Sequence, residues 1–264
     1  MSTHCPQIGP NASLSWFSLL ALGVMVTLGG RSFAFADDGT AELEVDHVFV
    51  VVERGAEDAT TALRGADLAM LDEVRTHEGQ GTASRFVFFD STYLELIWRE
   101  PDVALGESSQ DVADRLGASG CAAGAPSPFG VALRRITPND DPLPAPTTIY
   151  RADWMPADAQ AIEFFDVSDA PGAVFLFYVP PPMAVTGWKR PPSMPPAEER
   201  AKGPRRMTGV RVTTSAEVPP VLAPLGRDLE LETGDDCLLE LTFDDGATGR
   251  VDDLRPVLPV ILRR

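Results

Sequence analysis

LEVDHVFVVVE, residues 43–53, is the strongest strand signal of the sequence. Side chains alternate between the two faces of a strand, so Val45, His47 and Phe49 share one face and Asp46 points to the other. The stretch predicts a strand at the start of the folded domain, with a histidine on its Val45 face.

A helix and three further strands are predicted to follow this strand. Alanines and Leu63 recur at helical spacing from residue 56, and Gly65 marks the expected end of the helix. A glycine-rich turn, His77-Glu78-Gly79-Gln80-Gly81-Thr82, comes after the first of the three strands. The strands are predicted at residues 73–76, 85–89 and 92–98.

The rest of the chain contains two interruptions and a weaker copy of this order. Residues 101–128 are polar and rich in Gly and Ser, with room for one short helix. Residues 180–196 include seven prolines, which exclude regular sheet or helix there. Strands resume at 129–135 and 174–179. The later elements are predicted as strand 207–213, helix 216–225, and strands 228–232, 237–243 and 257–262.

These patterns predict an α+β fold in which a strand–helix–strand–strand–strand unit is duplicated. Two such units would form a curved mixed sheet around a central cleft, where ligands usually bind. The predicted organisation is a signal peptide at 1–36, a short acidic leader at 37–42, a first unit with an extension at 43–179, a proline-rich loop at 180–206, and a second, diverged unit at 207–264.

The amino terminus has the features of an export signal. An uncharged apolar stretch from Ser13 to Gly30 precedes Ala34 and Ala36, which fit the small-residue rule of signal peptidase. Cleavage after Ala36 would release the protein to the periplasm or the medium. An uncleaved membrane anchor is the alternative, because about 18 apolar residues can just span a bilayer.

The charge of the chain restricts its partners. It has 22 Lys and Arg residues against 39 Asp and Glu residues, a formal net charge of −17. Such a surface repels the phosphates of nucleic acids and anionic lipids. We therefore expect a small-molecule ligand, no nucleic acid, and no membrane partner beyond an uncleaved anchor. The sequence does not decide between a monomer and a homodimer.

Cys121 and Cys237 are the cysteines that remain after cleavage. In an oxidising compartment they could pair, although sequence spacing alone does not establish that their Cα atoms are close. Two buried, inert thiols are the alternative. The sequence has no C-x-x-C, G-x-S-x-G or dinucleotide-binding motif.

Short motifs follow one another in a characteristic order. They are Val45-Asp46-His47-Val48, His77-Glu78-Gly79-Gln80-Gly81-Thr82, Tyr93-Leu94-Glu95-Leu96, Ser127-Pro128-Phe129-Gly130 with Arg134, and Asp253-Leu254-Arg255-Pro256. Together, over residues 43–262, they resemble the glyoxalase-like domain family of the vicinal-oxygen-chelate superfamily. The resemblance implies two βαβββ modules around a divalent ion that chelates two adjacent oxygens of the substrate.

The resemblance also implies roles for individual residues. His47 matches a metal ligand on the first strand, and Glu95 matches one on the fourth. In the second unit the position aligned with His47 is Gly209, and the last strand offers no carboxylate. Half of the metal set is missing, which weakens the expectation of a metal-dependent isomerase and leaves the expected fold intact.

His47, His77 and Glu95 are the candidates for a metal site. Glu95 lies in an apolar strand, where an unpaired buried carboxylate costs several kcal/mol, so it should be paired, metal-bound or protonated. We expect His47 and Glu95 to face one site. With His77 they would form a set that suits zinc, iron(II) or manganese. The alternatives are a core histidine at position 47 and a solvent-facing loop histidine at position 77.

Gln80, Arg85, Tyr93 and Arg134 are the candidates for substrate binding. The two arginines interrupt apolar strands and could bind a substrate carboxylate; salt bridges to acidic neighbours are the alternative. Gln80 lies between glycines, which permit close approach of the backbone to a ligand. Tyr93 would line the cleft or belong to the core. The same holds for Trp98, Tyr150 and Trp154.

Two classes of function follow from these residues. The first is a lyase, isomerase or dioxygenase-like enzyme acting on a small carbonyl compound. In it Glu95 would be a metal ligand or a general base, and His47, with His77 as a third candidate, would hold the ion. The second is a metal-free protein that binds and sequesters a small molecule in the same cleft. The glycine at position 209 favours the second class, and the presence of His47 and Glu95 favours the first.

Overall fold

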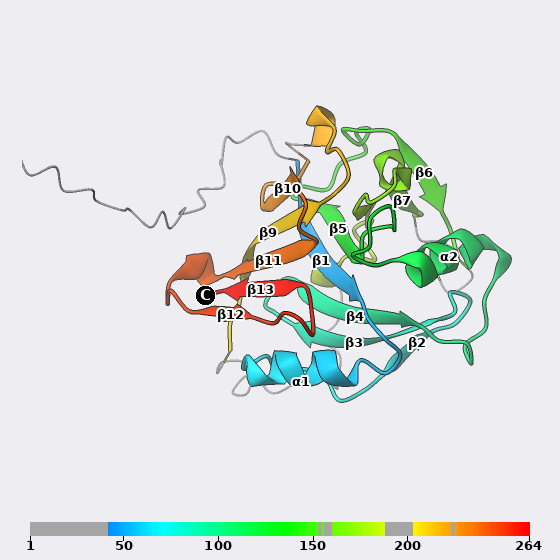
Figure 1. Cartoon of the computed structure of the whole chain (residues 1–264). Helices are drawn as coiled ribbons and strands as arrows, with labels where there is room; N and C mark the ends of the chain where they lie inside the picture. The colour runs from blue at the N-terminus through cyan, green and yellow to red at the C-terminus, as the bar shows by residue number, and fades with distance from the viewer. Residues whose placement is uncertain (1–41, 153–154, 156–159, 188–202, 223–224) are drawn as a thin grey trace, which may run out of the picture. The chain divides into compact units, whose positions relative to one another are not determined.

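The computed structural model describes residues 42–152, 155, 160–187, 203–222 and 225–264. The predicted signal peptide, residues 37–41 of the acidic leader, Trp154 and the middle of the proline-rich loop lie outside this range. The described residues form an eight-stranded sheet, a five-stranded sheet and two α-helices (Figure 1). None of their helices is long and apolar enough to cross a membrane.

The first module follows the predicted order. In the sheet, the last strand lies parallel beside the first, and the two middle strands continue outward in antiparallel pairs. The helix has Glu57 and Asp58 in its first turn and Arg64 in its last, which complements its dipole, and it buries Ala59 and Leu63. The elements are β1 (Leu43–Val51), α1 (Glu57–Gly65), β2 (Arg75–His77), β3 (Thr82–Phe88) and β4 (Tyr93–Arg99).

A second module with the same strand order begins at residue 129. β8 lies parallel beside β5, and β7 and β6 continue outward in antiparallel pairs. Residues 136–146, which connect β5 to β6, contain four prolines and no helix, and this explains why the sequence showed no helical periodicity there. The strands are β5 (Phe129–Arg135), β6 (Thr147–Tyr150), β7 (Ile162–Phe165) and β8 (Phe175–Tyr178).

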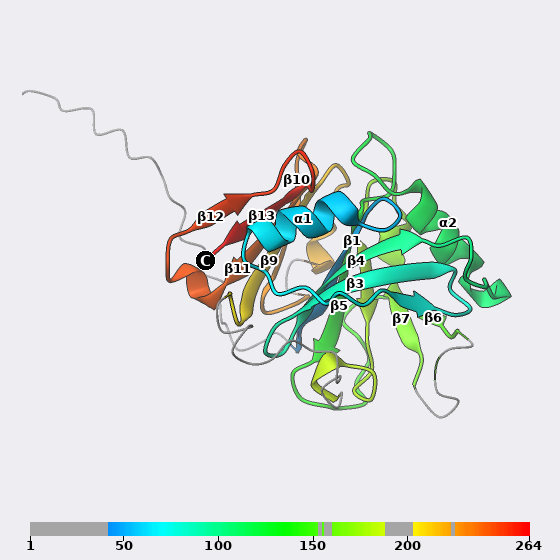
Figure 2. The ribbon, with the colours of Figure 1, turned by 90° about the horizontal axis from the view of Figure 1, so that it is seen from below.

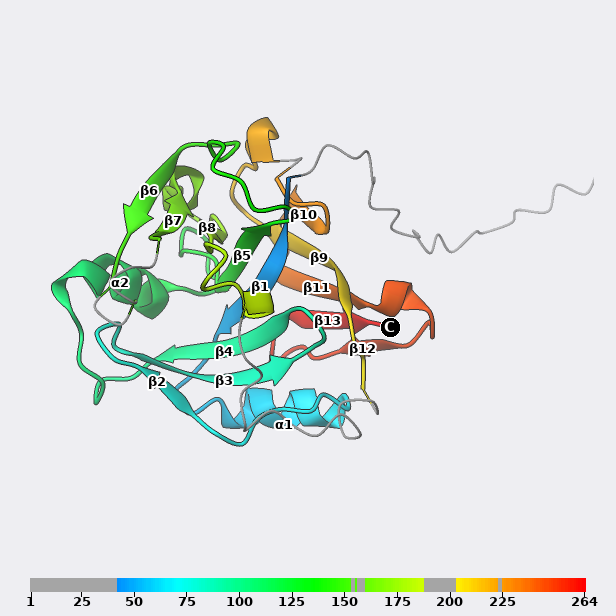
Figure 3. The ribbon, with the colours of Figure 1, turned by 180° about the vertical axis from the view of Figure 1, so that it is seen from behind.

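β1 and β5 pair antiparallel and join the modules into one curved sheet, ordered β2-β3-β4-β1-β5-β8-β7-β6 (Figure 3). The predicted fold class, paired modules in a mixed sheet around a cleft, is therefore confirmed. The boundaries of the modules are corrected, because both copies lie between residues 43 and 178.

The carboxy-terminal part is a separate sheet, ordered β10-β9-β11-β13-β12. Its first strand lies between two others and does not pair with its last, so the prediction that residues 207–264 form the second module is wrong. The described part of the predicted helix at 216–225 contains only a 3-10 turn, Pro220–Leu222. The strands are β9 (Met207–Thr214), β10 (Leu229–Thr233), β11 (Leu238–Phe243), β12 (Val251–Asp253) and β13 (Val260–Arg263).

One face of the eight-stranded sheet packs against this second sheet and α1 in a shared core (Figures 1 and 2). Val48, Leu94 and Val131 of the large sheet are fully buried there, as are Val210 and Leu241 of the small one. Burial of each such side chain contributes about 1.5–3 kcal/mol. This core lies on one face of the large sheet, and the opposite face carries separate buried clusters that include Phe49, Tyr93 and Phe177.

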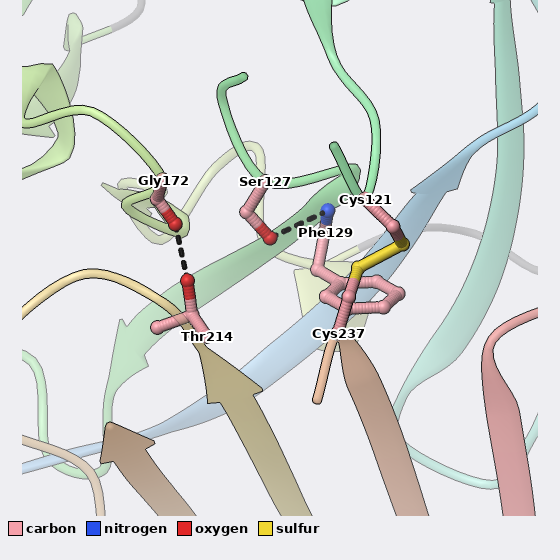
Figure 4. The surroundings of a disulfide bond; sticks show 6 residues. All are labelled: Cys121, Ser127, Phe129, Gly172, Thr214 and Cys237. Carbon is pink, nitrogen blue, oxygen red and sulfur yellow. Dashed lines mark hydrogen bonds between the residues drawn. A yellow bond between two sulfur atoms is a disulfide. The ribbon is translucent and has the colours of Figure 1, made fainter. Parts of the chain in front are cut away.

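A disulfide bond connects the loop between α2 (Gln110–Ala118) and β5 to the residue before β11 of the small sheet (Figure 4). Cys121 follows α2, Cys237 precedes β11, and their Cα atoms are 5.4 Å apart. The hydroxyl of Thr214 in β9 donates to the carbonyl of Gly172 nearby. Of the two alternatives for these cysteines, the structure has the bonded one.

Candidate functional site

The face of the large sheet opposite the core lines a cavity of about 410 Å³, which is within the usual range for small-molecule sites. Paired residues of neighbouring strands share a face, so the strand register arranges the floor of the cavity in two rows. The first row is Phe86, Glu95, Phe49, Gly130 and Phe175, and the second is Phe88, Tyr93, His47, Ala132 and Phe177.

His47 and Glu95 project into this cavity from neighbouring strands, one row apart. Their side chains are 8% and 7% exposed. Tyr93 stacks on the imidazole of His47, with ring centroids 4.2 Å apart and planes 11° from parallel. The structure thus places in one hollow the two groups that we expected to share a site.

Asp46 holds the imidazole in one orientation. A bulge between Val45 and His47 interrupts the alternation of β1, and the buried Asp46 carboxylate lies 2.7 Å from His47 Nδ1. Because an ionised carboxylate only accepts hydrogen bonds, Nδ1 is the donor of this pair, and Nε2 is the ring nitrogen that Asp46 leaves free of its own contact. Strict alternation predicts Asp46 on the opposite face of β1, away from His47, and the bulge is the reason for the difference.

The same carboxylate has two more donors. Arg134 Nη1 and the backbone N–H of Val185 donate to Asp46 Oδ2 at 3.0 and 2.9 Å. Burial alone would raise the pKa of Asp46. The hydrogen bond and charge of His47, the charge of Arg134 and the Val185 N–H outweigh burial, so this pKa lies below its ordinary value. Asp46 is therefore ionised at neutral pH.

Glu95 is held by a second polar cluster. Ser84, fully buried on β3, donates its hydroxyl to Glu95 Oε1 at 2.5 Å. His77 Nε2 lies 3.2 Å from Ser84 Oγ and 3.6 Å from Glu95 Oε1. The predicted strand began at residue 85, which is why Ser84 was missed. The Glu95 carboxylate therefore has the partner that its burial requires, the hydroxyl of Ser84. His77 lies on β2 and not in a loop.

Tyr93 and Gln80 line the cavity, as expected of substrate-binding residues. Burial and the negative charges of Glu95 and Asp46 raise the pKa of Tyr93 well above its ordinary value, so the phenol stays neutral. Tyr150 also lines the cavity, whereas Trp98 lies on the opposite face in the core.

Arg85 and Arg134 lie elsewhere, which corrects the expectation that they bind a ligand in the cavity. Arg85 points to the core side of β3 and donates to the carbonyls of Asp72 and Gly55 at 2.9 and 3.2 Å. Arg134 is engaged by Glu44 and Asp46. Among the described residues, Arg75 of β2 lines the cavity, and no sequence pattern had pointed to it.

The two modules can be superposed through their strand pairing. His47 lies opposite Tyr93 and Phe49 opposite Glu95 in the first module; in the second, Gly130 lies opposite Phe175 and Ala132 opposite Phe177. The positions equivalent to His47 and Glu95 are therefore Gly130 and Phe177. This corrects the earlier alignment of His47 with Gly209, which belongs to the separate small sheet.

The chelating metal centre that the resemblance implies is incomplete in this set of residues. Neither Gly130 nor Phe177 has a side-chain atom that can bind a metal. Among the residues that the structure describes, no group of three or more His, Cys, Asp and Glu side chains is arranged to hold an ion. We therefore derive no chemical step through a metal.

Comparison with known proteins gives a likeness of structure only. No family model matches the sequence, and no curated protein matches it. A solved hypothetical protein from Staphylococcus aureus is 12% identical, with a TM-score of 0.41, over 84% of this chain and 98% of its own. Methylmalonyl-CoA epimerase from Mycobacterium tuberculosis is 18% identical, with a TM-score of 0.31, over 54% of this chain and 91% of its own.

The class of protein is defined by the paired modules themselves. Each module has its first and last strands parallel and adjacent, and the first strands of the two modules pair with each other. A cavity lies over the face that these strands share. The chain has a glyoxalase-like, vicinal-oxygen-chelate fold.

Proposed function

We propose that the protein is an exported glyoxalase-like protein whose cavity binds a small carbonyl compound and moves a proton at the carbon next to the carbonyl. The observation that carries this proposal is the hydrogen bond between Asp46 and His47. A histidine held by a buried carboxylate can take a proton on its other nitrogen, and the carboxylate stabilises the imidazolium that forms.

In the proposed step, His47 Nε2 takes a proton from the carbon beside the carbonyl. The electron pair of that C–H bond forms the carbon–carbon double bond of an enolate, and the carbonyl oxygen takes the negative charge. Glu95, one row away, is the second group that exchanges protons with the ligand. Return of a proton to the same carbon gives exchange, and return to another position gives isomerisation.

A protein that only binds the ligand is the second candidate. It is favoured by Gly130 and Phe177, which replace polar residues with a hydrogen atom and a ring in the second module. The two candidates share the cavity and the ligand and differ in whether His47 and Glu95 react with it.

Proton exchange distinguishes these candidates. The protein is incubated with benzylacetone in deuterated water, and loss of the protons beside the carbonyl is followed by NMR. We expect saturable exchange that falls about 100-fold or more in H47Q and in E95Q. E232Q, a carboxylate on the small sheet, is the matched control and keeps the wild-type rate. Saturable binding without exchange would overturn the proposed chemistry and support the binding protein.

One observation favours a metal-dependent form of the site: His77 Nε2 lies 3.6 Å from Glu95 Oε1. Zinc, iron(II) or manganese held by His47, His77 and Glu95 would require these side chains to rearrange. Elemental analysis of protein purified without chelators tests this. About one ion per chain, lost in H77A, would favour the metal-dependent form.

Export is proposed on two grounds. The amino-terminal sequence fits a cleaved signal, and disulfides such as Cys121–Cys237 persist in oxidising compartments. Mass spectrometry of protein from the periplasm or medium should find Asp37 at the amino terminus. Recovery of the whole chain in the membrane fraction would favour the uncleaved anchor instead.

A further inference from the structure

We propose that the ligand carries a planar aromatic group, which occupies the half of the cavity formed by the second module. The position of its carbonyl beside His47 rests on the proposed function. The aromatic group is inferred separately, from the shape and chemistry of the wall that faces His47.

That wall is built of rings. Phe164 and Phe175 meet edge to face with centroids 4.8 Å apart, and Phe175 and Phe177 lie 5.6 Å apart and tilted by 43°. Tyr150 stacks on Phe164 at 4.7 Å. Because the rings are held at different angles to one another, they present both faces and edges. These are the surfaces that an aromatic ligand complements by stacking and by edge-to-face contact.

Phe49 extends this wall toward the polar groups. A Cβ atom on Gly130 would lie 2.0 Å from Phe49 Cε1, so the ring of Phe49 occupies the space of a side chain at position 130. Gly130 is the counterpart of His47 in the second module. The place of a second polar ligand is thus taken by an aromatic ring, whose centroid lies 6.0 Å from that of Phe175.

Polar groups on this side already have partners within the protein. The hydroxyl of Tyr150 forms a hydrogen bond with Ser109 Oγ at 2.8 Å. The guanidinium of Arg115, which lies 4.8 Å from the centre of the Phe175 ring, donates to the carbonyls of Ser168 and Ala173. Val112 and Leu116 of α2 and Ile162 of β7 also line this side. This half of the cavity is therefore suited to an apolar group and offers a charged one no evident partner among the described residues.

A matched pair of ketones tests the inference. Benzylacetone and its cyclohexyl counterpart have the same carbonyl and chain, and only the first has a planar ring. We expect benzylacetone to bind about five- to tenfold more tightly to the wild-type protein by calorimetry. The preference should disappear in F177L and F164L and persist in F89L, a matched change in the core.

Equal affinity of the wild-type protein for the two ketones would overturn this inference, and that comparison does not depend on any variant folding. The outcome is separate from that of the proposed function. Tight binding of benzylacetone without proton exchange would leave the aromatic site standing and remove the chemistry. Equal binding of both ketones with exchange would do the reverse.

Discussion

Asp46 connects three parts of the protein through one carboxylate. It accepts hydrogen bonds from His47 on its own strand, Arg134 on β5 and Val185 in the segment that follows β8. Val185 comes two residues after Met183, which lines the cavity together with Pro182. The residue that fixes the histidine therefore also fixes part of the cavity wall.

Replacement of Asp46 by Asn should lower both stability and reactivity. The amide has one accepting oxygen, so its nitrogen would face a donor of Arg134, His47 or Val185. We expect the free energy of unfolding in urea to fall by about 3–5 kcal/mol, as when a buried ion pair loses one partner. D245N, an exposed aspartate, is the control. A loss in D46N no larger than in D245N would contradict the role of this carboxylate.

The stability of the protein should depend on Asp46 at acidic pH. Its pKa is lower in the folded chain than its ordinary value of 3.8. The unfolded chain therefore binds a proton more readily, and the stability that Asp46 contributes is fully present above pH 3.8 and is lost as pH falls through the folded pKa. The difference in melting temperature between wild type and D46N should therefore shrink as the pH is lowered from neutral to about pH 3. A constant difference would contradict this assignment.

At the scale of elements, the ring of Phe49 on β1 covers Gly130 on the paired strand β5. G130A forces the ring of Phe49 to move, because the added methyl group would overlap it. We expect a loss of about 1–3 kcal/mol in unfolding free energy. F49L/G130A should recover part of this loss, since the smaller side chain leaves room for the methyl group.

Gly65 provides the control for this substitution. It ends α1, and a Cβ atom there would have no neighbour within 4 Å. G65A should therefore leave stability nearly unchanged. If G65A and G130A lost similar amounts of unfolding free energy, the loss in G130A would be a general effect of replacing glycine by alanine. It would then not come from the overlap with Phe49.

Alternation and helical spacing were sufficient to predict the first module, where both patterns are strong. They failed where a local feature broke the pattern. The bulge at Val45 and His47 turned Asp46 toward the histidine, and the prolines of 136–146 replaced the helix by which the second module would have been recognised. Ser84 was missed because the strand was predicted to begin at residue 85, three residues after the start of β3. The ring of Phe49 over Gly130 follows from strand pairing, which one sequence does not reveal.

At the scale of the whole molecule, the disulfide joins segments separated by 116 residues. A crosslink that closes so long a loop restricts the unfolded chain, so C121S/C237S should lose about 2–5 kcal/mol of unfolding free energy. Neither cysteine lines the cavity, so benzylacetone should bind the variant with unchanged affinity below its unfolding transition. An unchanged urea midpoint would contradict this prediction, because it would show that the crosslink does not destabilise the unfolded chain relative to the folded one.

The unequal modules suggest how this protein can diversify. One copy carries His47 and Glu95, and the equivalent positions of the other hold a hydrogen atom and a ring. Changes in β5–β8 can then alter which molecule is admitted while His47 on β1 and Glu95 on β4 stay in place. The residues that select the ligand and the residues proposed to react with it would then be encoded in different parts of one gene. Each set could change at its own rate.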